Sequence, residues 1–207
     1  MKSYEAVEWH DKKADEWEKM RIGIGNFTLE KQNICIRELY PKKNEKILDV
    51  GCGTGFFASK AAKRQANIIG LDMSENMLKV AEKIAKKNNL KIKFIKGNAE
   101  KLPFKNCSFD KVIAVDLIGH LPNPQKFIKE VGRVIKNGGK FILAWPYSKS
   151  PYRIKYYFEK YILKKNLPFT KWLSVNLVEK WLRYSSFKTK RIRTSFNITI
   201  ILVCEKI

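Results

Sequence analysis

Residues 47–58 read ILDVGCGTGFFA: a short apolar run ends in an acidic residue, and evenly spaced glycines follow it. The segment Lys46–Val50 has the length and apolar content of a buried strand, and a helix is expected to begin at Phe56. A glycine-rich turn between a strand and a helix is a common nucleotide site, because the backbone can approach the ligand closely there. The stretch therefore predicts an α/β fold with a nucleotide-like ligand at the end of a strand.

The order of residues in this turn favours a ligand with a positive charge. Gly51, Gly53 and Gly55 are spaced two apart, whereas the dinucleotide fingerprint G-x-G-x-x-G needs a wider second interval. Asp49 precedes the turn, and its carboxylate would repel a phosphate but suit an ammonium or sulfonium group. Asp72 ends the next expected strand, where an acidic side chain can accept hydrogen bonds from ribose hydroxyls. These residues predict a nucleoside with a cationic tail.

From residue 45 onward, short apolar runs alternate with longer amphipathic segments, which is typical of a parallel sheet flanked by helices. Five such strand–helix units are expected to end in a hairpin, whose antiparallel strands reverse at Ser195 and Phe196. The expected strands are 46–50, 67–71, 91–95, 109–115, 140–145, 188–194 and 197–205, and the expected helices are 56–64, 74–87 and one beginning at Pro124.

Two segments lie outside this alternating pattern. Residues 1–44 contain two helical patterns, around 7–20 and around 27–40, and residues 146–185 are basic, aromatic and interrupted by prolines. No internal repeat or low-complexity linker separates the segments. We therefore expect a single domain over 1–207, with N-terminal helices, a core over 45–145, a cap over 146–185 and a C-terminal hairpin over 186–207.

The chain carries a formal charge of +22, with 42 Lys and Arg residues against 20 Asp and Glu residues. Residues 1–45 are neutral, whereas residues 146–207 contain 14 basic and 3 acidic residues. The positive electrostatic field of so many basic residues favours anionic partners: RNA, DNA, an acidic membrane surface or an acidic metabolite. Only 8 of the basic residues are arginines, the side chain preferred for bidentate phosphate contacts. We favour a compositional origin for the charge, because AT-rich genomes encode abundant Lys, Ile and Asn.

The sequence predicts a cytoplasmic protein. The N-terminus MKSYEAVEWHDKK is polar and charged, unlike a signal peptide, and no apolar run approaches the ~20 residues needed to cross a bilayer. The four cysteines have no paired spacing, which predicts reduced thiols and no metal site.

Five segments in this order resemble a class I S-adenosylmethionine-dependent methyltransferase, of the small-molecule and lipid type. They are ILDVGCGTGFFA (47–58), GLDMSENML (70–78), FIKGNAEKLPF (94–104), SFDKVIAVDLIGHL (108–121) and FIKEVGRVIKNGGKFIL (127–143). The resemblance implies a Rossmann-like three-layer sandwich on a seven-stranded, mostly parallel sheet with an antiparallel last strand. It also implies S-adenosyl-L-methionine as cofactor and S-adenosyl-L-homocysteine as product.

The resemblance also assigns roles to individual residues. Asp49 and the glycine turn would hold the methionine part of the cofactor, and Asp72 would bind the ribose hydroxyls. The family often has Asp where this chain has Asn98, whose amide oxygen can still accept a hydrogen bond from the adenine amino group. Tyr4 and Trp17 fall in the segment that resembles the family's lid helix. The implied cofactor-binding residues are Asp49, Gly51, Cys52, Gly53, Gly55, Asp72, Met73, Asn98, Ala99, Asp116, Leu117, Tyr4 and Trp17.

His120 and Asp116 are the candidate catalytic residues. His120 follows the fourth expected strand, and an imidazole titrates near neutral pH, so it could act as a general base. The alternatives are that His120 has a packing or hydrogen-bonding role and that Asp116 caps a turn. The sulfonium methyl group is already activated, so the protein chiefly has to align donor and acceptor and exclude water.

Residues 145–172 are rich in aromatic and basic side chains, and three uses compete for them. They could stack bases and hold phosphates, rest on anionic lipid, or form the wall of an apolar pocket. We favour the pocket, because substrate caps in the family follow the fifth strand. The candidate substrate-binding residues are Trp145, Tyr147, Tyr152 and Tyr156.

The sequence therefore predicts methyl transfer to an O, N or C atom of a small molecule that is anionic or lipophilic. An RNA methyltransferase, most plausibly acting on tRNA, and a non-catalytic adenosylmethionine-binding regulator are the alternatives. The absence of an N/D-P-P-Y/F motif argues against methylation of DNA bases.

Overall fold

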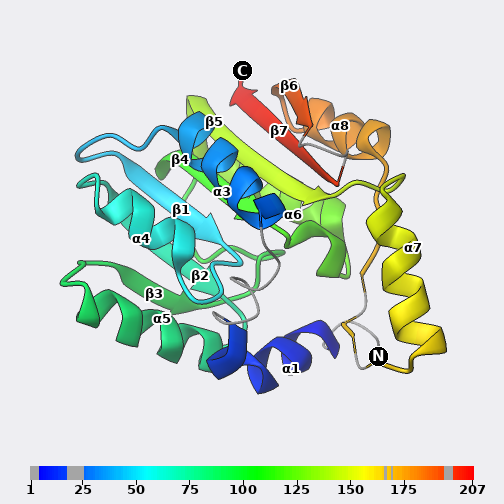
Figure 1. The fold of residues 1–207 in the computed structure, drawn as a ribbon. Coiled ribbons are helices and arrows are strands. Elements are labelled where there is room, and N and C mark those ends of the chain that lie inside the picture. Colours follow the sequence, from blue (N-terminus) through cyan, green and yellow to red (C-terminus); the bar gives the residue numbers. More distant parts are fainter. Residues whose placement is uncertain (1–4, 18–25, 166, 169, 194–197) are drawn as a thin grey trace.

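The computed structural model describes residues 5–17, 26–165, 167–168, 170–193 and 198–207. Its strands form one seven-stranded sheet in the order β3-β2-β1-β4-β5-β7-β6 (Figure 1). All neighbours are parallel except the two pairs that include β7, which runs antiparallel to β5 and β6. This confirms the predicted sheet. The strands are β1 (Lys46–Val50), β2 (Asn67–Asp72), β3 (Lys93–Lys96), β4 (Phe109–Val115), β5 (Ile135–Pro146), β6 (Phe187–Arg193) and β7 (Thr199–Lys206).

Helices cover both faces of the sheet and give a three-layer sandwich (Figure 1). One apolar cluster joins the sheet to α6 and α8, and a second joins the opposite face to α3 and α4. The helices are α1 (Glu5–Lys12), α3 (Asn26–Leu39), α4 (Phe56–Ala62), α5 (Glu75–Lys87), α6 (Pro124–Val134), α7 (Pro151–Tyr157) and α8 (Val175–Tyr184), with a 3-10 turn η1 (Ile118–His120) and a π-helical turn η2 (Phe158–Ile162).

Local sequence explains where α5 begins and which side it buries. Ser74 has an extended backbone, and its hydroxyl accepts a hydrogen bond from the Met77 amide at 3.1 Å, which satisfies a free donor of the first turn. The apolar residues recur at helical spacing and are buried; they are Met77, Leu78, Ala81 and Ala85. This places the start of α5 directly beside the end of β2.

The fifth strand differs most from its expected bounds. It begins at Ile135 rather than Lys140, and its register against β4 jumps from Phe109–Ile135 to Lys111–Lys140. Gly138 has a φ of +72°, and the Asn-Gly-Gly sequence at 137–139 forms an irregularity within the strand. The reversal expected at Ser195 and Phe196 lies outside the described residues.

The two segments outside the alternating core contribute α3 and α8 to the two faces of the sheet, and α1 and α7 lie beyond them. α1 packs beside α5, and α7 lies at the right-hand edge of the molecule in Figure 1. None of the helices in the described ranges has the length and apolar composition needed to cross a bilayer.

Candidate functional site

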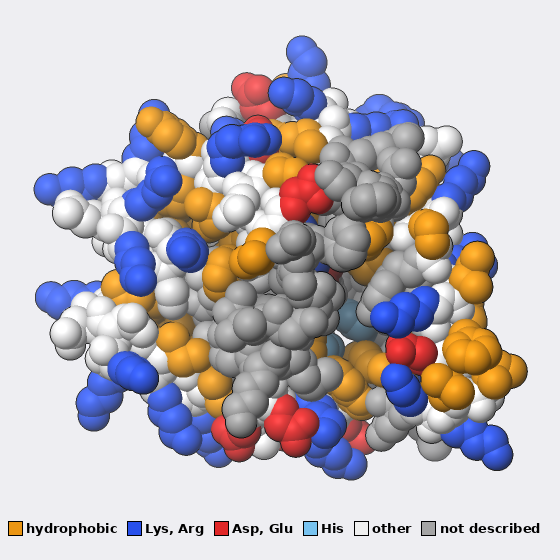
Figure 2. All heavy atoms as spheres, in the orientation of Figure 1, with side chains coloured by type: hydrophobic (Ala, Val, Ile, Leu, Met, Phe, Trp, Pro, Cys, Tyr) orange, Lys and Arg blue, Asp and Glu red, His pale blue; other side chains and the backbone are white. Residues whose placement is uncertain are grey.

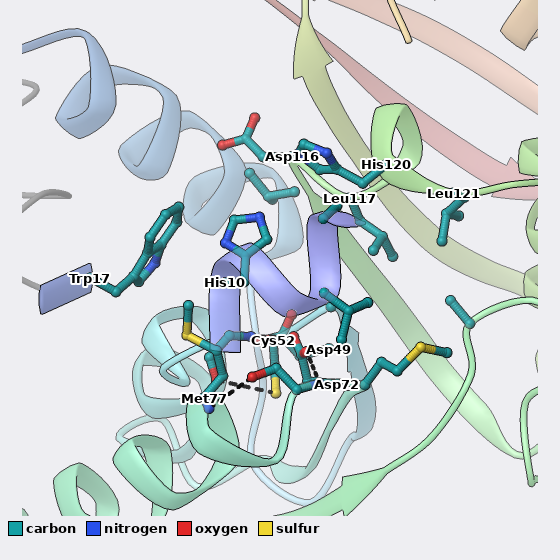
Figure 3. A pocket seen from close by; sticks show the side chains of 18 of the residues that line it. His10, Trp17, Asp49, Cys52, Asp72, Met77, Asp116, Leu117, His120 and Leu121 are labelled. Carbon is teal, nitrogen blue, oxygen red and sulfur yellow. Dashed lines mark hydrogen bonds between the residues drawn. The ribbon is translucent and has the colours of Figure 1, made fainter. Parts of the chain in front are cut away.

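A cavity of about 1220 Å³ lies at the carboxyl ends of the parallel strands (Figure 3). This is the edge at which open α/β sheets bind ligands. The glycine turn, the end of β2, the segment after β3 and the loop after β4 all contribute to its wall, together with α1, α3 and α7. Residues predicted from the sequence that line it are Asp49, Gly51, Cys52, Gly53, Asp72, Met73, Asn98, Ala99, Asp116, Leu117, His120 and Trp17.

The glycine turn has a backbone that favours glycine at each of its three positions. Gly51, Gly53 and Gly55 have φ values of +71°, +51° and +79°. A Cβ atom added to Gly51 would lie 2.9 Å from the Leu117 side chain, and one added to Gly55 would lie 3.1 Å from Phe94. A Cβ atom at Gly53 would meet nothing within 4 Å, so a ligand can reach the backbone there. Gly55 packs against the protein and is not part of the cavity wall.

Asp49 is a buried carboxyl group whose charge would be stabilised by a cationic ligand. It is 1% exposed, and its carboxylate accepts a hydrogen bond from the Ala58 amide at 3.1 Å, in the first turn of α4. Burial, together with the nearby Asp72 carboxylate, raises the pKa of Asp49 to about 7. A positive group beside it would favour its ionised form, as expected for a ligand with a cationic tail.

Asp72 is held at the end of β2 by two backbone amides. Its carboxylate oxygens accept hydrogen bonds from the Gly53 amide at 2.8 Å and the Ser74 amide at 2.9 Å. Burial raises the pKa of Asp72 above its ordinary value. Each oxygen keeps lone pairs for further donors, so this fixed carboxylate fits a pair of ribose hydroxyls. The two carboxyls and the glycine turn together fit a nucleoside with a positive tail.

The segment after β3 forms a second wall of the same cavity. The amide oxygen of Asn98 accepts a hydrogen bond from the Glu100 amide at 2.8 Å, an Asx turn that fixes the side chain. This bond uses one of the oxygen's two lone pairs and leaves the other for a donor such as the adenine amino group. Glu100 in turn accepts a hydrogen bond from the Asn123 amide at 2.6 Å, which ties the segment to the start of α6.

Helix α1 is fastened over the cavity by Asp11. Its carboxylate accepts hydrogen bonds from the Ser74 hydroxyl at 2.6 Å, the Asn76 amide at 3.1 Å and the Asn76 side-chain nitrogen at 2.8 Å. The Ser74 hydrogen bond lowers the pKa of Asp11 below its ordinary value. Sequence reasoning missed this contact, because its partners are more than sixty residues apart and no local pattern joins them.

Two histidines meet inside the cavity. The rings of His10 and His120 lie 5.5 Å apart between centroids, and Trp17 packs against His10 at 4.9 Å. Burial and the nearby His120 lower the pKa of His10 to about 3, against an opposing effect of Asp116. Figure 3 shows both rings and Asp116 around the part of the cavity beside the Asp49 and Asp72 carboxylates. Of the two, only His120 was a candidate from the sequence, because an isolated histidine in a helical segment carries little signal.

Asp116 and His120 are oriented by further contacts. Asp116 has a φ of +58°, and its carboxylate forms an ion pair with Lys31 of α3. Nδ1 of His120 lies 3.5 Å from the Thr170 hydroxyl. Residues from α3, η1 and the segment before α8 therefore converge on the same wall.

Three of the four expected substrate-binding aromatics, Trp145, Tyr147 and Tyr156, are not among the residues that line the cavity. Trp145 is a core residue, 1% exposed, because β5 is covered on both faces, and its indole N–H donates to the Leu173 carbonyl at 3.1 Å. Tyr156 is buried and donates to the Pro168 carbonyl at 2.6 Å, and Tyr147 packs against the core. The side chain of Tyr152, like all of Tyr4, lies outside the described residues. The cap residues that line the cavity are Pro146, Pro151, Lys155 and Glu159.

Comparison with known proteins adds a family and a set of relatives. A family model described as a methyltransferase domain matches residues 41–191. A ubiquinone biosynthesis O-methyltransferase from Coxiella burnetii is 36% identical over 102 residues, which cover 49% of this chain and 44% of that protein. The chain thus matches less than half the length of that relative.

Solved structures agree on the fold. PH0226 protein from Pyrococcus horikoshii superposes with a TM-score of 0.72 at 25% identity, over 89% of this chain and 93% of that one. YcgJ protein from Bacillus subtilis gives a TM-score of 0.69 at 18% identity, over 84% and 97% of the two chains. The second likeness bears on the fold alone.

Proposed function

This chain belongs to the class I S-adenosylmethionine-dependent methyltransferases, and we propose that its acceptor is a hydroxyl group on a small, lipophilic molecule. S-adenosylmethionine, when bound, supplies a methyl group on a positively charged sulfur. The observation that carries the proposal is the pair of histidines beside Asp116, in the same cavity as the two buried carboxyls.

We assign the cofactor to the wall formed by the glycine turn and the end of β2. Asp49 and the backbone at Gly53 would hold the methionine part, and Asp72 would accept hydrogen bonds from the ribose hydroxyls. Met73, Asn98 and Ala99 would surround the adenine, since they line the neighbouring wall. The donor methyl group would then point toward Asp116, Leu117 and the histidines.

A hydroxyl acceptor needs a base, because a neutral hydroxyl is a poor nucleophile until its proton is removed. His120 is the residue placed to take that proton. Two imidazoles this close do not both carry a proton readily, since like charges repel each other. His10 stays neutral because its pKa is lowered to about 3, so a proton taken from the acceptor would rest on His120.

The remaining wall favours an apolar acceptor. Side chains of Phe56, Leu121, Pro122 and Ile198 line the cavity. The Coxiella burnetii relative named for O-methylation in ubiquinone biosynthesis supports a hydroxyl as the acceptor group.

Methyl transfer from radiolabelled S-adenosylmethionine to matched phenols, catechols and alkyl amines tests the proposal. We expect labelled hydroxyl acceptors, and His120→Gln should lower kcat by about 10²-fold, as expected for loss of a general base. Cofactor affinity, measured by titration calorimetry, should stay within twofold, because the base contacts the acceptor side. Transfer to amines or tRNA but to no hydroxyl compound would contradict the proposal.

A further inference from the structure

The cap helix exposes an apolar stripe to solvent. Side chains at intervals of three and four residues along α7 and η2 share one helix face and are between 39% and 75% exposed. The rings of Tyr157 and Tyr161 stack at 5.8 Å, which confirms that these positions lie side by side. The stripe consists of Ile154, Tyr157, Phe158, Tyr161 and Ile162, and Leu163 continues it at 51% exposed. Figure 2 shows hydrophobic side chains gathered at the right-hand edge, where Figure 1 places the lower end of α7.

The apolar face of this helix points to solvent, which is the reverse of a usual amphipathic surface helix. The opposite side of the same helix faces the protein: Tyr156 is buried, and Lys155 and Glu159 line the cavity. Helices on the surface of a globular protein normally bury the apolar stripe and expose the charged face. A contiguous apolar surface that the fold leaves uncovered marks a site of interaction with another phase or molecule.

Positive charge surrounds the stripe. The Arg153 guanidinium lies 5.7 Å from the centroid of the Tyr157 ring, and Lys164 and Lys165 follow directly after η2. Glu159 is the single acidic residue between 146 and 178, and it pairs with Lys165 at 2.9 Å. Aromatic and aliphatic side chains flanked by Lys and Arg are the composition of helices that lie in the interface of an anionic bilayer.

We propose that the stripe on α7 and η2 docks the protein on the surface of an anionic lipid bilayer. A second copy of this chain is a poorer occupant, because a two-fold contact through the stripe would bring the same basic residues together. RNA is also a poorer occupant, because the exposed aliphatic side chains of Ile154 and Ile162 offer nothing to bases or phosphates.

Docking through this face would set the cavity beside the membrane, since α7 supplies part of the cavity wall. A lipophilic acceptor could then pass from the bilayer into the site. That consequence rests on the proposed function, whereas the docking itself does not.

Co-sedimentation with vesicles tests docking without any acceptor, so its outcome is independent of the reaction. We expect the full chain to bind vesicles of phosphatidylglycerol and phosphatidylcholine, and to bind pure phosphatidylcholine at least tenfold less. The triple variant Phe158→Ser, Tyr161→Ser, Ile162→Ser should lose at least tenfold in binding to the anionic vesicles. Tyr184→Ser, at a 73% exposed aromatic outside the stripe, is the matched control and should bind like the wild type.

Three results would overturn the proposal. One is equal vesicle binding by the triple variant and the control, when both bind S-adenosylhomocysteine like the wild type. The second is a wild-type dimer in sedimentation velocity that the triple variant converts to a monomer, with no vesicle binding. The third is salt-sensitive binding to tRNA with none to vesicles.

Discussion

Asp11 links the N-terminal helix to the cofactor wall, and replacing it should weaken cofactor binding from outside the cavity. Asp11→Ala removes the acceptor for the Ser74 hydroxyl and for both nitrogens of Asn76. A hydrogen bond to a charged group contributes about 1.5–3 kcal/mol when buried. Asp11 is partly exposed, so we take about 1 kcal/mol or less for each bond, and about 2 kcal/mol for the set.

A loss of about 2 kcal/mol changes the docking equilibrium of α1 by about 30-fold. Cofactor affinity can fall by at most this factor, because the docked helix contributes His10 to the cavity wall. We expect the Kd for S-adenosylhomocysteine to rise roughly tenfold in calorimetry. Hydrogen exchange in residues 5–12 should become faster, while exchange in β4 should not change.

Two further variants sharpen the test. Asp11→Asn keeps an oxygen acceptor without the charge, so it should fall between the wild type and Asp11→Ala. Asp15→Ala removes an exposed carboxylate from the same segment and should bind like the wild type. The reasoning is refuted if Asp11→Ala binds within twofold of the wild type and its N-terminal exchange is unaltered.

Three more outcomes are expected. Cofactor affinity should rise about tenfold from pH 6 to pH 8, because the pKa of Asp49 is raised to about 7 and a cationic ligand needs its carboxylate; Asp49→Asn should flatten this profile in calorimetry. The pKa of His10 is about 3 in the folded protein, below its ordinary value of 6.5. As the pH falls, His10 therefore becomes protonated in undocked or unfolded chains before it does in the folded protein. The stability of the wild type relative to His10→Gln should therefore fall by about 1.4 kcal/mol per pH unit as the pH drops below 6.5 in urea titrations. Finally, Gly51→Ala should lower the free energy of unfolding of the ligand-free protein by about 1–3 kcal/mol, from left-handed strain and the close Leu117 side chain. Gly53→Ala should show the strain alone, and equal losses in both variants would contradict the Leu117 contact.

The fold was predictable because its signals are local. Strand β1 coincides with the expected 46–50, and the Ser74 cap and the buried face of α5 follow from residues within one helix. The bulge in β5 was missed because the Asn-Gly-Gly sequence at 137–139 is typical of a turn, and only pairing with β4 keeps it in the sheet.

The cofactor wall was predictable because each of its residues follows a recognisable strand end. The acceptor wall was not, because it is assembled by contacts between distant segments. His10 lies beside His120, and the neighbouring Asp11 binds the start of α5. The aromatic residues of the cap were expected to form the wall of a substrate pocket. In the structure they differ in burial: Trp145 and Tyr156 are buried and stabilise the fold, whereas the stripe residues are exposed.

The five residues from Asp72 to Asn76 perform two tasks at once. Asp72 is oriented by the Ser74 amide, and the Ser74 hydroxyl and Asn76 bind Asp11 of the covering helix. A substitution in this pentapeptide therefore alters ribose recognition and the covering of the cavity together. Affinity for the donor and access to the site are therefore expected to change together in the course of evolution, because both depend on this segment.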